Sequence, residues 1–322
     1  MRVLVTGISG FIGSHLAEYL TQILPEVEIF GLVRPRSCLC GLNRVVSRVK
    51  LIEGDVRDQI SVLRALAEVR PDRIFHLAGQ SAVEASFRVP DETFSINILG
   101  TVNLLEALLE LRLNPVVLLA SSAEAYGLAF LAELPIKETA PLRPLNPFGV
   151  SKAAQDLLGF QYYKNYGLNI IRARIFNTLG PRQPIHYQVS SLANQIAEIE
   201  KKKREPVLKV GSLENKKDYI DVRDLVRALW LTADRGEPGE VYNLGSGQSW
   251  SGNEILKLML GMTRARLMLE TVDKKHDNKN ILLEPPILLA DINRLVKLTG
   301  WKPQISLRQS ILDLINYWRE QG

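Results

Sequence analysis

The sequence contains few cysteines and few histidines. Its 322 residues include only Cys38 and Cys40, which are separated by one residue, and four scattered histidines. Cysteines this close together do not form a framework of long-range disulfides, and the chain has no CxxC pair or HExxH helix that would indicate zinc. We therefore expect no metal site and a reducing, cytoplasmic compartment.

Long apolar runs are also missing. No stretch approaches the ~20 apolar residues that span a bilayer, and the apolar N-terminal segment is interrupted by glycines, His15 and Glu18. The net charge is +5, and the densest basic run, residues 201–204 (KKKR), ends a helical pattern without interleaved aromatics. We interpret this run as a solvated helix end. We expect neither a membrane nor a nucleic acid as a partner.

The first two-thirds of the chain alternate β-branched apolar runs with longer amphipathic segments. This alternation predicts right-handed crossovers and an α/β, doubly wound parallel sheet of the Rossmann type. The expected strands are Val3–Thr6, Val27–Val33, Val49–Glu53, Arg73–Ala78, Pro115–Ser121 and Ile170–Phe176. The expected helices are Phe11–Leu24, Gln59–Val69, Thr93–Leu111 and Pro147–Tyr166. A later helix, Arg223–Ala233, and a strand, Glu240–Leu244, extend the pattern.

A glycine-rich segment follows the first expected strand. Residues 7–13 read GISGFIG and open an expected helix. Glycines at this spacing serve a tight turn, a close approach of the backbone to a pyrophosphate, and close packing of the helix on the strand. The helix start adds amide donors. We therefore expect a dinucleotide at Gly7, Gly10, Phe11, Ile12 and Gly13.

The end of the second expected strand distinguishes between the two nicotinamide cofactors. NAD-binding proteins usually place an acidic residue there for the ribose diol, whereas an arginine accommodates the 2′-phosphate of NADP. Residues 33–37 read VRPRS and include no Asp or Glu. We expect NADP as the cofactor, held by Arg34 with help from Arg36 or Ser37.

These patterns divide the chain into two parts. We expect an NADP-binding Rossmann domain in residues 1–176 plus about 221–250. Residues 177–220 plus 251–322 are expected to form a smaller, α-rich C-terminal substrate-binding lobe, with a last helix from about Leu307.

Several further motifs together resemble the extended short-chain dehydrogenase/reductases (the NAD-dependent epimerases and dehydratases). They are residues 54–57 (GDVR), residues 76–81 (HLAGQS) and Asn97 in residues 95–101 (SINILGT). The resemblance spans nearly the whole chain. It implies that Asp55 and Val56 meet the adenine, that Leu77, Ala78 and Gln80 lie against the cofactor, and that Asn97 is structural.

Within that family, two segments resemble the GDP-mannose branch: residues 120–127 (ASSAEAYG) and 210–214 (VGSLE). The branch includes GDP-mannose 4,6-dehydratase and the reductase of its 4-keto-6-deoxy product. The resemblance implies that Ser122 hydrogen-bonds the C4 oxygen of the hexose and that Glu124 removes the C5 proton. Both follow the fifth expected strand, at the carboxyl edge where open α/β sheets bind ligands.

The chain departs from the family at the tyrosine of its Tyr-x-x-x-Lys motif. This spacing places both side chains on one helix face, where the ammonium lowers the pKa of the phenol and prepares it to exchange a proton. Here Lys152 is present, but Phe148 occupies the tyrosine position. A phenyl ring packs similarly and carries no proton. Whether the replacement is engineered or natural stays open, and Tyr126 is a candidate substitute.

The expected substrate positions also differ from the branch. Lys217 stands before Asp218-Tyr219 where relatives carry an arginine, so the charge is kept but the bidentate fork is lost. Residues 281–284 read ILLE where the branch carries Arg-Pro-x-Glu. The substrate-binding candidates are Asn177, Lys209, Lys217 and Glu284, while Arg182 and Arg223 are either further contacts or surface charges.

The leading hypothesis is an NADP-dependent enzyme similar to GDP-mannose 4,6-dehydratase that acts on a nucleotide sugar, a GDP-hexose. The alternatives are the GDP-4-keto-6-deoxy-D-mannose reductase and a catalytically silent protein that binds NADP or a nucleotide sugar. Phe148, Ile281 and Lys217 favour silence, whereas Ser122, Glu124 and Lys152 favour chemistry. The family resemblance also predicts a homodimer or homotetramer, formed through helices Thr93–Leu111 and Pro147–Tyr166.

Overall fold

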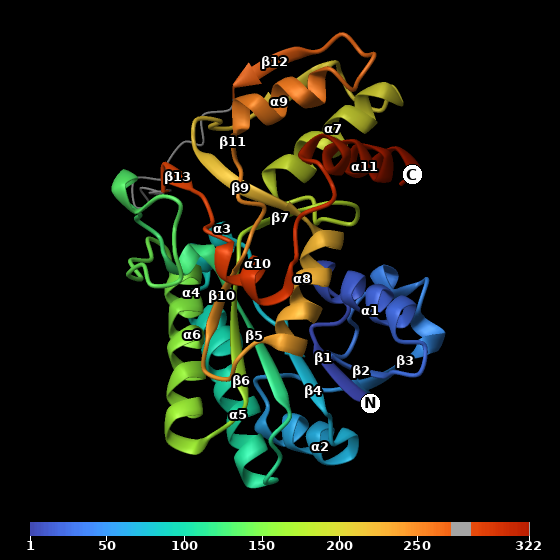
Figure 1. The fold of residues 1–322 in the computed structure, drawn as a ribbon. Helices are drawn as coiled ribbons and strands as arrows, with labels where there is room; N and C mark the ends of the chain where they lie inside the picture. Colours follow the sequence, from blue (N-terminus) through green and yellow to red (C-terminus); the bar gives the residue numbers. More distant parts are fainter. Residues whose placement is uncertain (272–284, 322) are drawn as a thin grey trace.

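The computed structural model describes residues 1–271 and 285–321, and its centre is a parallel sheet of seven strands in the order β3-β2-β1-β4-β5-β6-β10 (Figure 1). The strands are β1 (Arg2–Thr6), β2 (Glu28–Val33), β3 (Val49–Glu53), β4 (Arg73–His76), β5 (Val116–Ser122), β6 (Ile170–Ile175) and β10 (Val241–Leu244). The strand order reverses between β1 and β4, and ligands of open α/β sheets bind at the carboxyl ends beside such a switch point.

Helices cover both faces of this sheet. The helices α1 (Phe11–Ile23) and α8 (Val222–Arg235) pack together on one face, and α2 (Gln59–Val69), α5 (Gly100–Glu110) and α6 (Pro147–Tyr166) cover the other. Each face has its own buried apolar cluster, with Leu16 and Leu229 in the first and Leu66 and Leu108 in the second. Because both faces are covered, β5 and β6 are apolar along most of their length. The predicted doubly wound α/β fold is confirmed.

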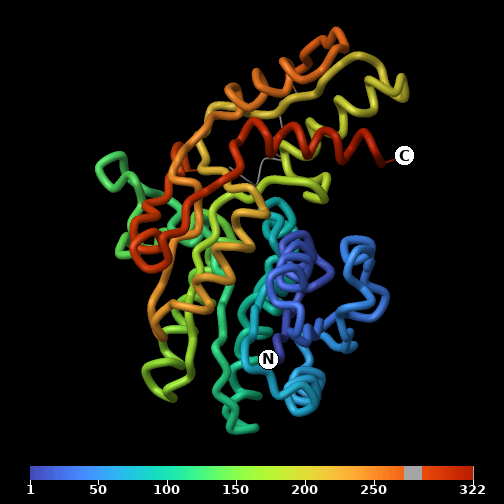
Figure 2. The backbone as a smooth tube through the Cα atoms, turned by 45° about the vertical axis from the view of Figure 1, so that its right-hand side comes forward, coloured from blue at the N-terminus to red at the C-terminus, as the bar shows by residue number. Residues whose placement is uncertain are grey.

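A smaller lobe sits over the carboxyl edge of the sheet (Figures 1 and 2). Its helices are α7 (Gln188–Glu200), α9 (Gly252–Leu260) and α11 (Leu307–Glu320), and α10 (Asn293–Thr299) lies between it and the sheet. Its short strands are β7 (Asn177–Leu179), β8 (Val207–Val210), β9 (Lys216–Asp221), β11 (Ser249–Ser251), β12 (Met268–Thr271) and β13 (Ile287–Leu288). A separate apolar cluster joins α7, α9 and α11.

The segment expected as one helix from Thr93 to Leu111 is composite. It begins in the last residues of α4 (Pro90–Phe94), which follows α3 (Val83–Arg88). It continues through a π-helical segment, Ser95–Leu99, and becomes α5. The fourth strand ends at His76 and not at Ala78. Most strands of the smaller lobe were not predicted, because strands of two to four residues are too short for an alternation pattern to be recognised.

Two absences hold within the described ranges. There, no helix combines the length and apolar character that a membrane crossing requires, and no three His, Cys, Asp or Glu side chains gather in a group suited to a metal ion. Cys38 and Cys40 are paired with each other in a disulfide, which joins no separate elements of the fold.

Candidate functional site

The three glycines of the turn between β1 and α1 have different roles. Gly7 has a φ of +72°, and a Cβ there would lie 2.8 Å from the backbone nitrogen of Ala78. A Cβ at Gly13 would lie 2.3 Å from the carbonyl oxygen of Gly7. Gly10 caps α1, which has no side-chain cap and no acidic residue in its first turn. The amides of Phe11 and Ile12 therefore remain suited to an anion at the helix start.

Arg34 and Asp55 lie close together at the carboxyl ends of β2 and β3. Arg34 is exposed, and the amide of Gly54 donates to the carbonyl of Val33, which holds the two strand ends in register. Arg57 Nη2 donates to Asp55 Oδ2 at 2.7 Å. This hydrogen bond lowers the pKa of Asp55 first, and the charge of Arg34 contributes further. The predicted phosphate clamp and the predicted adenine contact thus share one end of the sheet edge.

The loop after β4 is held by Asn97 in the π-helical segment. The amide of Gln80 donates to Asn97 Oδ1 at 2.8 Å, and Asn97 Nδ2 donates to the carbonyl of Gln80 at 3.0 Å and to Ser151 Oγ at 2.8 Å. The amide of Ala78 donates to Thr6 Oγ1, which positions the loop against β1. The structural role implied for Asn97 therefore has a direct geometric basis. π-Helical segments are frequent at functional sites.

Lys152 is buried at the centre of the predicted site. Its Nζ donates to the carbonyl of Ala120 at 2.7 Å and to Gln155 Oε1 at 2.9 Å. Gln155 Nε2 donates in turn to Thr101 Oγ1, which also contacts His76 Nε2. Burial lowers the pKa of Lys152 to about 8.

The network that supports Lys152 was not predicted from the sequence. Two sequence features could have indicated it: Gln155 lies three residues after Lys152 on one helix, and His76 ends a buried strand. The tertiary structure makes them partners, because Thr101 comes from a different helix.

Ser122 and Glu124 lie at the end of β5, beside the start of α6. Ser122 Oγ accepts from the amide of Glu124 and closes a short turn. Glu124 Oε2 accepts from Asn146 Nδ2 at 2.9 Å, and Asn146 Oδ1 caps α6 by accepting from the amide of Gly149. A Cβ at Gly149 would lie 2.5 Å from the carbonyl of Glu124, so the turn and the helix start are in close contact.

Phe148 occupies the first turn of α6 and is buried. The Nζ of Lys152 lies 6.0 Å from the centre of its ring. The ring of Phe148 therefore lies beside the lysine on the same helix.

Tyr126 does not substitute for the missing phenol. Its hydroxyl donates to Asn243 Oδ1 at 2.7 Å and accepts from Arg174 Nη1 at 2.9 Å. Burial, ahead of other influences, raises the pKa of Tyr126 to about 12. This residue belongs to a buried structural network and is bound on both sides.

The predicted substrate residues are only partly brought together. Asn177 on β7 pairs with Tyr219 on β9, two residues after Lys217, and Asn177 Nδ2 donates to the carbonyl of Asp218. Lys209 is exposed on β8, which pairs with β12 in a separate two-stranded sheet. Glu284 lies outside the described residues.

The remaining arginine candidates are engaged in ion pairs. Arg182 binds Glu18 of α1 through both terminal nitrogens, and Arg223 binds Asp221 and Asp313. These contacts join the two parts of the fold, which supports the interpretation of both as structural charges.

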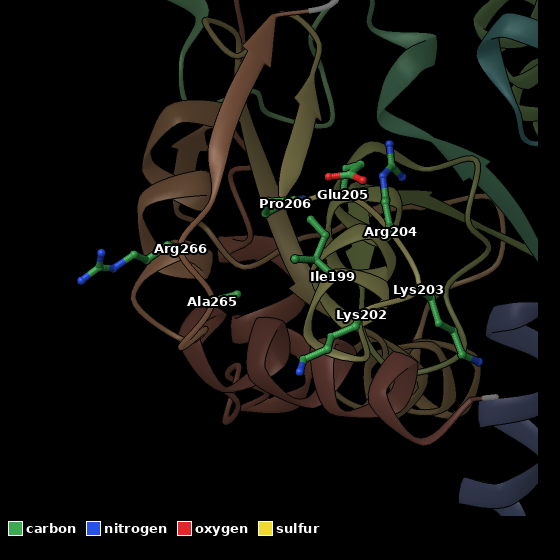
Figure 3. Close-up of a pocket in the computed structure, with 8 residues that line it drawn as sticks. All are labelled: Ile199, Lys202, Lys203, Arg204, Glu205, Pro206, Ala265 and Arg266. Carbon is green, nitrogen blue, oxygen red and sulfur yellow. The ribbon is translucent and has the colours of Figure 1, made fainter.

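A basic hollow of about 640 Å³ lies elsewhere, at the end of α7. In Figure 3 the side chains of Lys203, Arg204 and Arg266 point in different directions and do not converge on one point. Lys201 donates to the carbonyl of Gln321, and Arg204 pairs with Glu198 at 3.7 Å. This geometry fits the interpretation of residues 201–204 as a solvated helix end.

Comparisons with known proteins identify the family of the chain. The family model described as GDP-mannose 4,6 dehydratase matches residues 4–314. The GDP-6-deoxy-D-mannose reductase of Pseudomonas aeruginosa is 33% identical, over 99% of this chain and 98% of the relative. The GDP-mannose 4,6-dehydratase of Vibrio cholerae is 29% identical, over 99% and 94%.

Solved structures of related enzymes resemble this chain over almost its whole length. The structure of RMD from Pseudomonas aeruginosa complexed with NADPH has a TM-score of 0.85 and 32% identity, with 99% of each chain covered. DesIV, a dTDP-glucose 4,6-dehydratase from Streptomyces venezuelae with NAD and TYD bound, has a TM-score of 0.88 and 26% identity, with 100% of this chain and 98% of that chain covered. The chain therefore belongs to the GDP-mannose 4,6-dehydratase family of enzymes, a branch of the extended short-chain dehydrogenase/reductases.

Proposed function

We propose that the protein uses NADP(H) to transfer a hydride at C4 of a GDP-hexose, and that its reaction is the 4,6-dehydration of GDP-mannose. The observation that carries this proposal is Glu124. Its carboxylate is fixed by Asn146 beside Ser122, at the carboxyl edge of the sheet. A base at this position has a role in removing the C5 proton during dehydration, whereas simple reduction at C4 does not require one.

The residues at the sheet edge fit NADP. The amides at the start of α1 lack a side-chain cap, and Gln80 Oε1 is buried without a hydrogen-bond partner, so it is available to a ribose hydroxyl. Arg34 offers an exposed guanidinium for the 2′-phosphate, and Asp55 and Val56 lie beside it for the adenine. Leu77 and Ala78 complete the proposed cofactor wall. When bound, the nicotinamide supplies and accepts the hydride.

The protein's own groups position and deprotonate the sugar in this proposal. Ser122 orients the C4 oxygen, and Glu124 takes the C5 proton once C4 is a ketone. Two N–H groups of the Lys152 ammonium donate to Ala120 and Gln155. Its third N–H binds the ribose of the cofactor. Phe148 shapes the pocket and moves no proton.

The same proposal assigns cofactor binding to one part of the fold and substrate binding to the other. Residues 1–176 plus about 221–250 bind NADP, and residues 177–220 plus 251–322 bind the substrate. Asn177 and Lys217 are the proposed contacts to the diphosphate, because the pairing of β7 with β9 places Asn177 opposite Tyr219, two residues from Lys217. Lys209 and Glu284 remain predicted contacts.

Reduction of a GDP-4-keto-6-deoxyhexose is the second candidate reaction. It is supported by the 33% identity to a relative named as a GDP-6-deoxy-D-mannose reductase. A silent binding protein is favoured by the departures at Phe148, Lys217 and Ile281, whereas the buried and hydrogen-bonded Lys152 argues against it.

The test is turnover of GDP-mannose with NADP⁺, followed by the appearance of the 4-keto-6-deoxy product. Glu124→Gln is expected to reduce product formation by ~100-fold or more, because general base catalysis contributes about 10²–10⁴-fold. Binding of NADP⁺ is the control and should not change.

If both the chain and Phe148→Tyr bind NADP⁺ but form no product, the dehydratase assignment fails. Turnover of the 4-keto sugar with NADPH then decides for the reductase.

A further inference from the structure

Replacement of the family tyrosine by Phe148 removes the group that exchanges a proton with the C4 oxygen. The chain has nine tyrosines. Most lie away from the carboxyl edge of the sheet, in α1, in the last turns of α6, in β10 and in α11. Tyr126 is bound within its buried network, and Tyr219 packs among the apolar side chains of the smaller lobe.

Tyr187 lies elsewhere, at the contact between the two parts of the fold. It is the residue that caps α7 in the smaller lobe, yet its hydroxyl lies 2.8 Å from Ser81 Oγ in the loop after β4. The ring of Tyr187 is half-buried and packs against His186, with ring centres 4.4 Å apart. The smaller lobe thus presents a phenol to the loop after β4, which is proposed to lie against the cofactor.

This loop is in direct contact with the surroundings of Lys152. A Cβ at Gly79 would lie 3.5 Å from Lys152 Nζ. Gln80 is held by Asn97, which also donates to Ser151, the neighbour of Lys152. Ser81 therefore extends from a loop that is anchored on the lysine side of the site, and its own side chain is exposed to solvent.

We propose that Tyr187, together with Ser81, is the proton carrier for the C4 oxygen in this protein and replaces the phenol that Phe148 lacks. The inference rests on the proposed hydride transfer at C4. It adds a catalytic residue from the smaller lobe, on a different element from the family tyrosine.

In this proposal the proton of the C4 hydroxyl reaches water without the formation of a free phenolate. When C4 is oxidised, the C4–H bond leaves with its electron pair as hydride to NADP⁺. The proton of the C4 hydroxyl passes to Tyr187 Oη, the Tyr187 proton passes to Ser81 Oγ, and the Ser81 proton passes to water. The electron pair of the broken O–H bond becomes the second bond of the ketone. Reduction with NADPH runs the same relay in reverse.

The surroundings of Tyr187 favour proton transfer through the two hydroxyl groups of Tyr187 and Ser81 over a phenolate at Tyr187. Burial raises the pKa of Tyr187, with the hydrogen bond to Ser81 opposing it. The phenol therefore stays protonated at neutral pH, and a hydroxyl pair that accepts one proton while it releases another needs no stable charge.

The experiment compares four forms of the full chain: the unchanged protein, Tyr187→Phe, Phe148→Tyr, and the two substitutions combined. Turnover is measured on GDP-mannose with NADP⁺ and on the 4-keto-6-deoxy sugar with NADPH. We expect Tyr187→Phe to lower kcat by ~100-fold or more, with the affinity for NADPH and the thermal midpoint of unfolding unchanged. In the combined variant, the hydroxyl at position 148 is expected to restore activity.

Tyr317→Phe in α11 is the matched control, since it removes a phenol far from the site. The rescue separates proton transfer from a purely structural contact between the lobes, because a hydroxyl at position 148 does not repair a lost contact between Tyr187 and Ser81. The solvent deuterium isotope effect on kcat is a second readout, and it is expected to change in Tyr187→Phe.

The outcomes also separate this inference from the proposed function. If the unchanged chain is active and Tyr187→Phe retains activity within a few-fold, the inference is wrong and the function stands. The inference is equally wrong, and the function still stands, if only the forms with Phe148→Tyr are active. If no form turns over either substrate, the proposed hydride transfer is wrong, and the role of Tyr187 is rejected with it.

Discussion

Lys152 holds an ammonium group in surroundings that disfavour charge. Burial lowers its pKa to about 8, and the hydrogen bonds to Ala120 and Gln155 offset part of the cost of desolvation. The spacing of four residues from Phe148 placed both on one helix face, and the structure confirms that they are neighbours. The partners of Lys152 come from β5 and from its own helix, which the motif alone did not predict.

At the same scale, the choice of cofactor depends on Arg34. Arg34→Ala is expected to weaken NADPH binding by ~10-fold or more, because a hydrogen bond to a charged group contributes about 1.5–3 kcal/mol. NADH lacks the 2′-phosphate, so its affinity should hardly change. Fluorescence titration with both cofactors measures the two effects.

Arg64→Ala provides the control, since Arg64 is an exposed arginine that contacts the carbonyl of Glu53. Equal loss of NADPH and NADH affinity in Arg34→Ala would contradict the assignment of the 2′-phosphate to this residue.

At the scale of elements, α6 reverses the usual arrangement of polar and apolar faces. Its buried face carries Ser151, Lys152, Gln155 and Asp156, while Val150, Leu157 and Phe160 are exposed. Asp156 pairs with Arg172 and Arg174 of β6 at 2.8 Å, so the buried charges are compensated. The helix is therefore fixed to the sheet by polar contacts, and its apolar side is left outside.

Two buried histidines, His15 in α1 and His76 in β4, make the free energy of unfolding depend on pH. Burial, followed by the charge of Arg182, lowers the pKa of His15 to about 4, and burial, followed by the charge of Lys152, lowers that of His76 to about 3. The unfolded chain binds protons from about pH 6.5 downward, while the folded protein stays neutral at both sites. The free energy of unfolding should therefore fall as the pH drops below 6.5, by at most about 1.4 kcal/mol per pH unit for each histidine.

Urea denaturation between pH 6.5 and 5, above the range in which most carboxylates titrate, measures this slope. In His76→Gln one of the two buried histidines is gone, and the slope should be smaller. An unchanged slope in His76→Gln would show that this histidine is protonated in the folded state.

At the scale of the whole molecule, the two parts meet at several polar contacts. His15 Nε2 lies 2.9 Å from the carbonyl oxygen of Pro181, Arg182 binds Glu18, and Tyr187 contacts Ser81. These contacts place the smaller lobe over the carboxyl edge of the sheet (Figure 2). The proposed site therefore takes residues from both parts.

The exposed apolar side of α6 is the proposed interface with a second copy of the chain, in a homodimer or in each half of a homotetramer. Leu157 is 59% exposed there, and Leu99 next to α5 is 55% exposed. Leu157→Lys is expected to convert the assembly to a smaller species, because it places a charge in the apolar contact.

Sedimentation velocity at micromolar concentration measures the assembly, with Ile60→Lys as control. Ile60 is 76% exposed on α2, outside the two helices of the proposed interface. If the unchanged chain sediments as a monomer, the proposed interface is wrong.

The sequence by itself determined the sheet, the glycine turn and the residue types at the site. Strand and helix periods report burial directly, and the spacing of Gly7, Gly10 and Gly13 has few other structural uses. Only the tertiary structure decided which distant groups become neighbours. It bound Tyr126 into a buried network, placed Gln155 and His76 behind Lys152, and set Tyr187 against Ser81. Apart from the pair of Gln155 and Lys152 within α6, these contacts join elements far apart in the chain. No local pattern encodes the packing that brings those elements together.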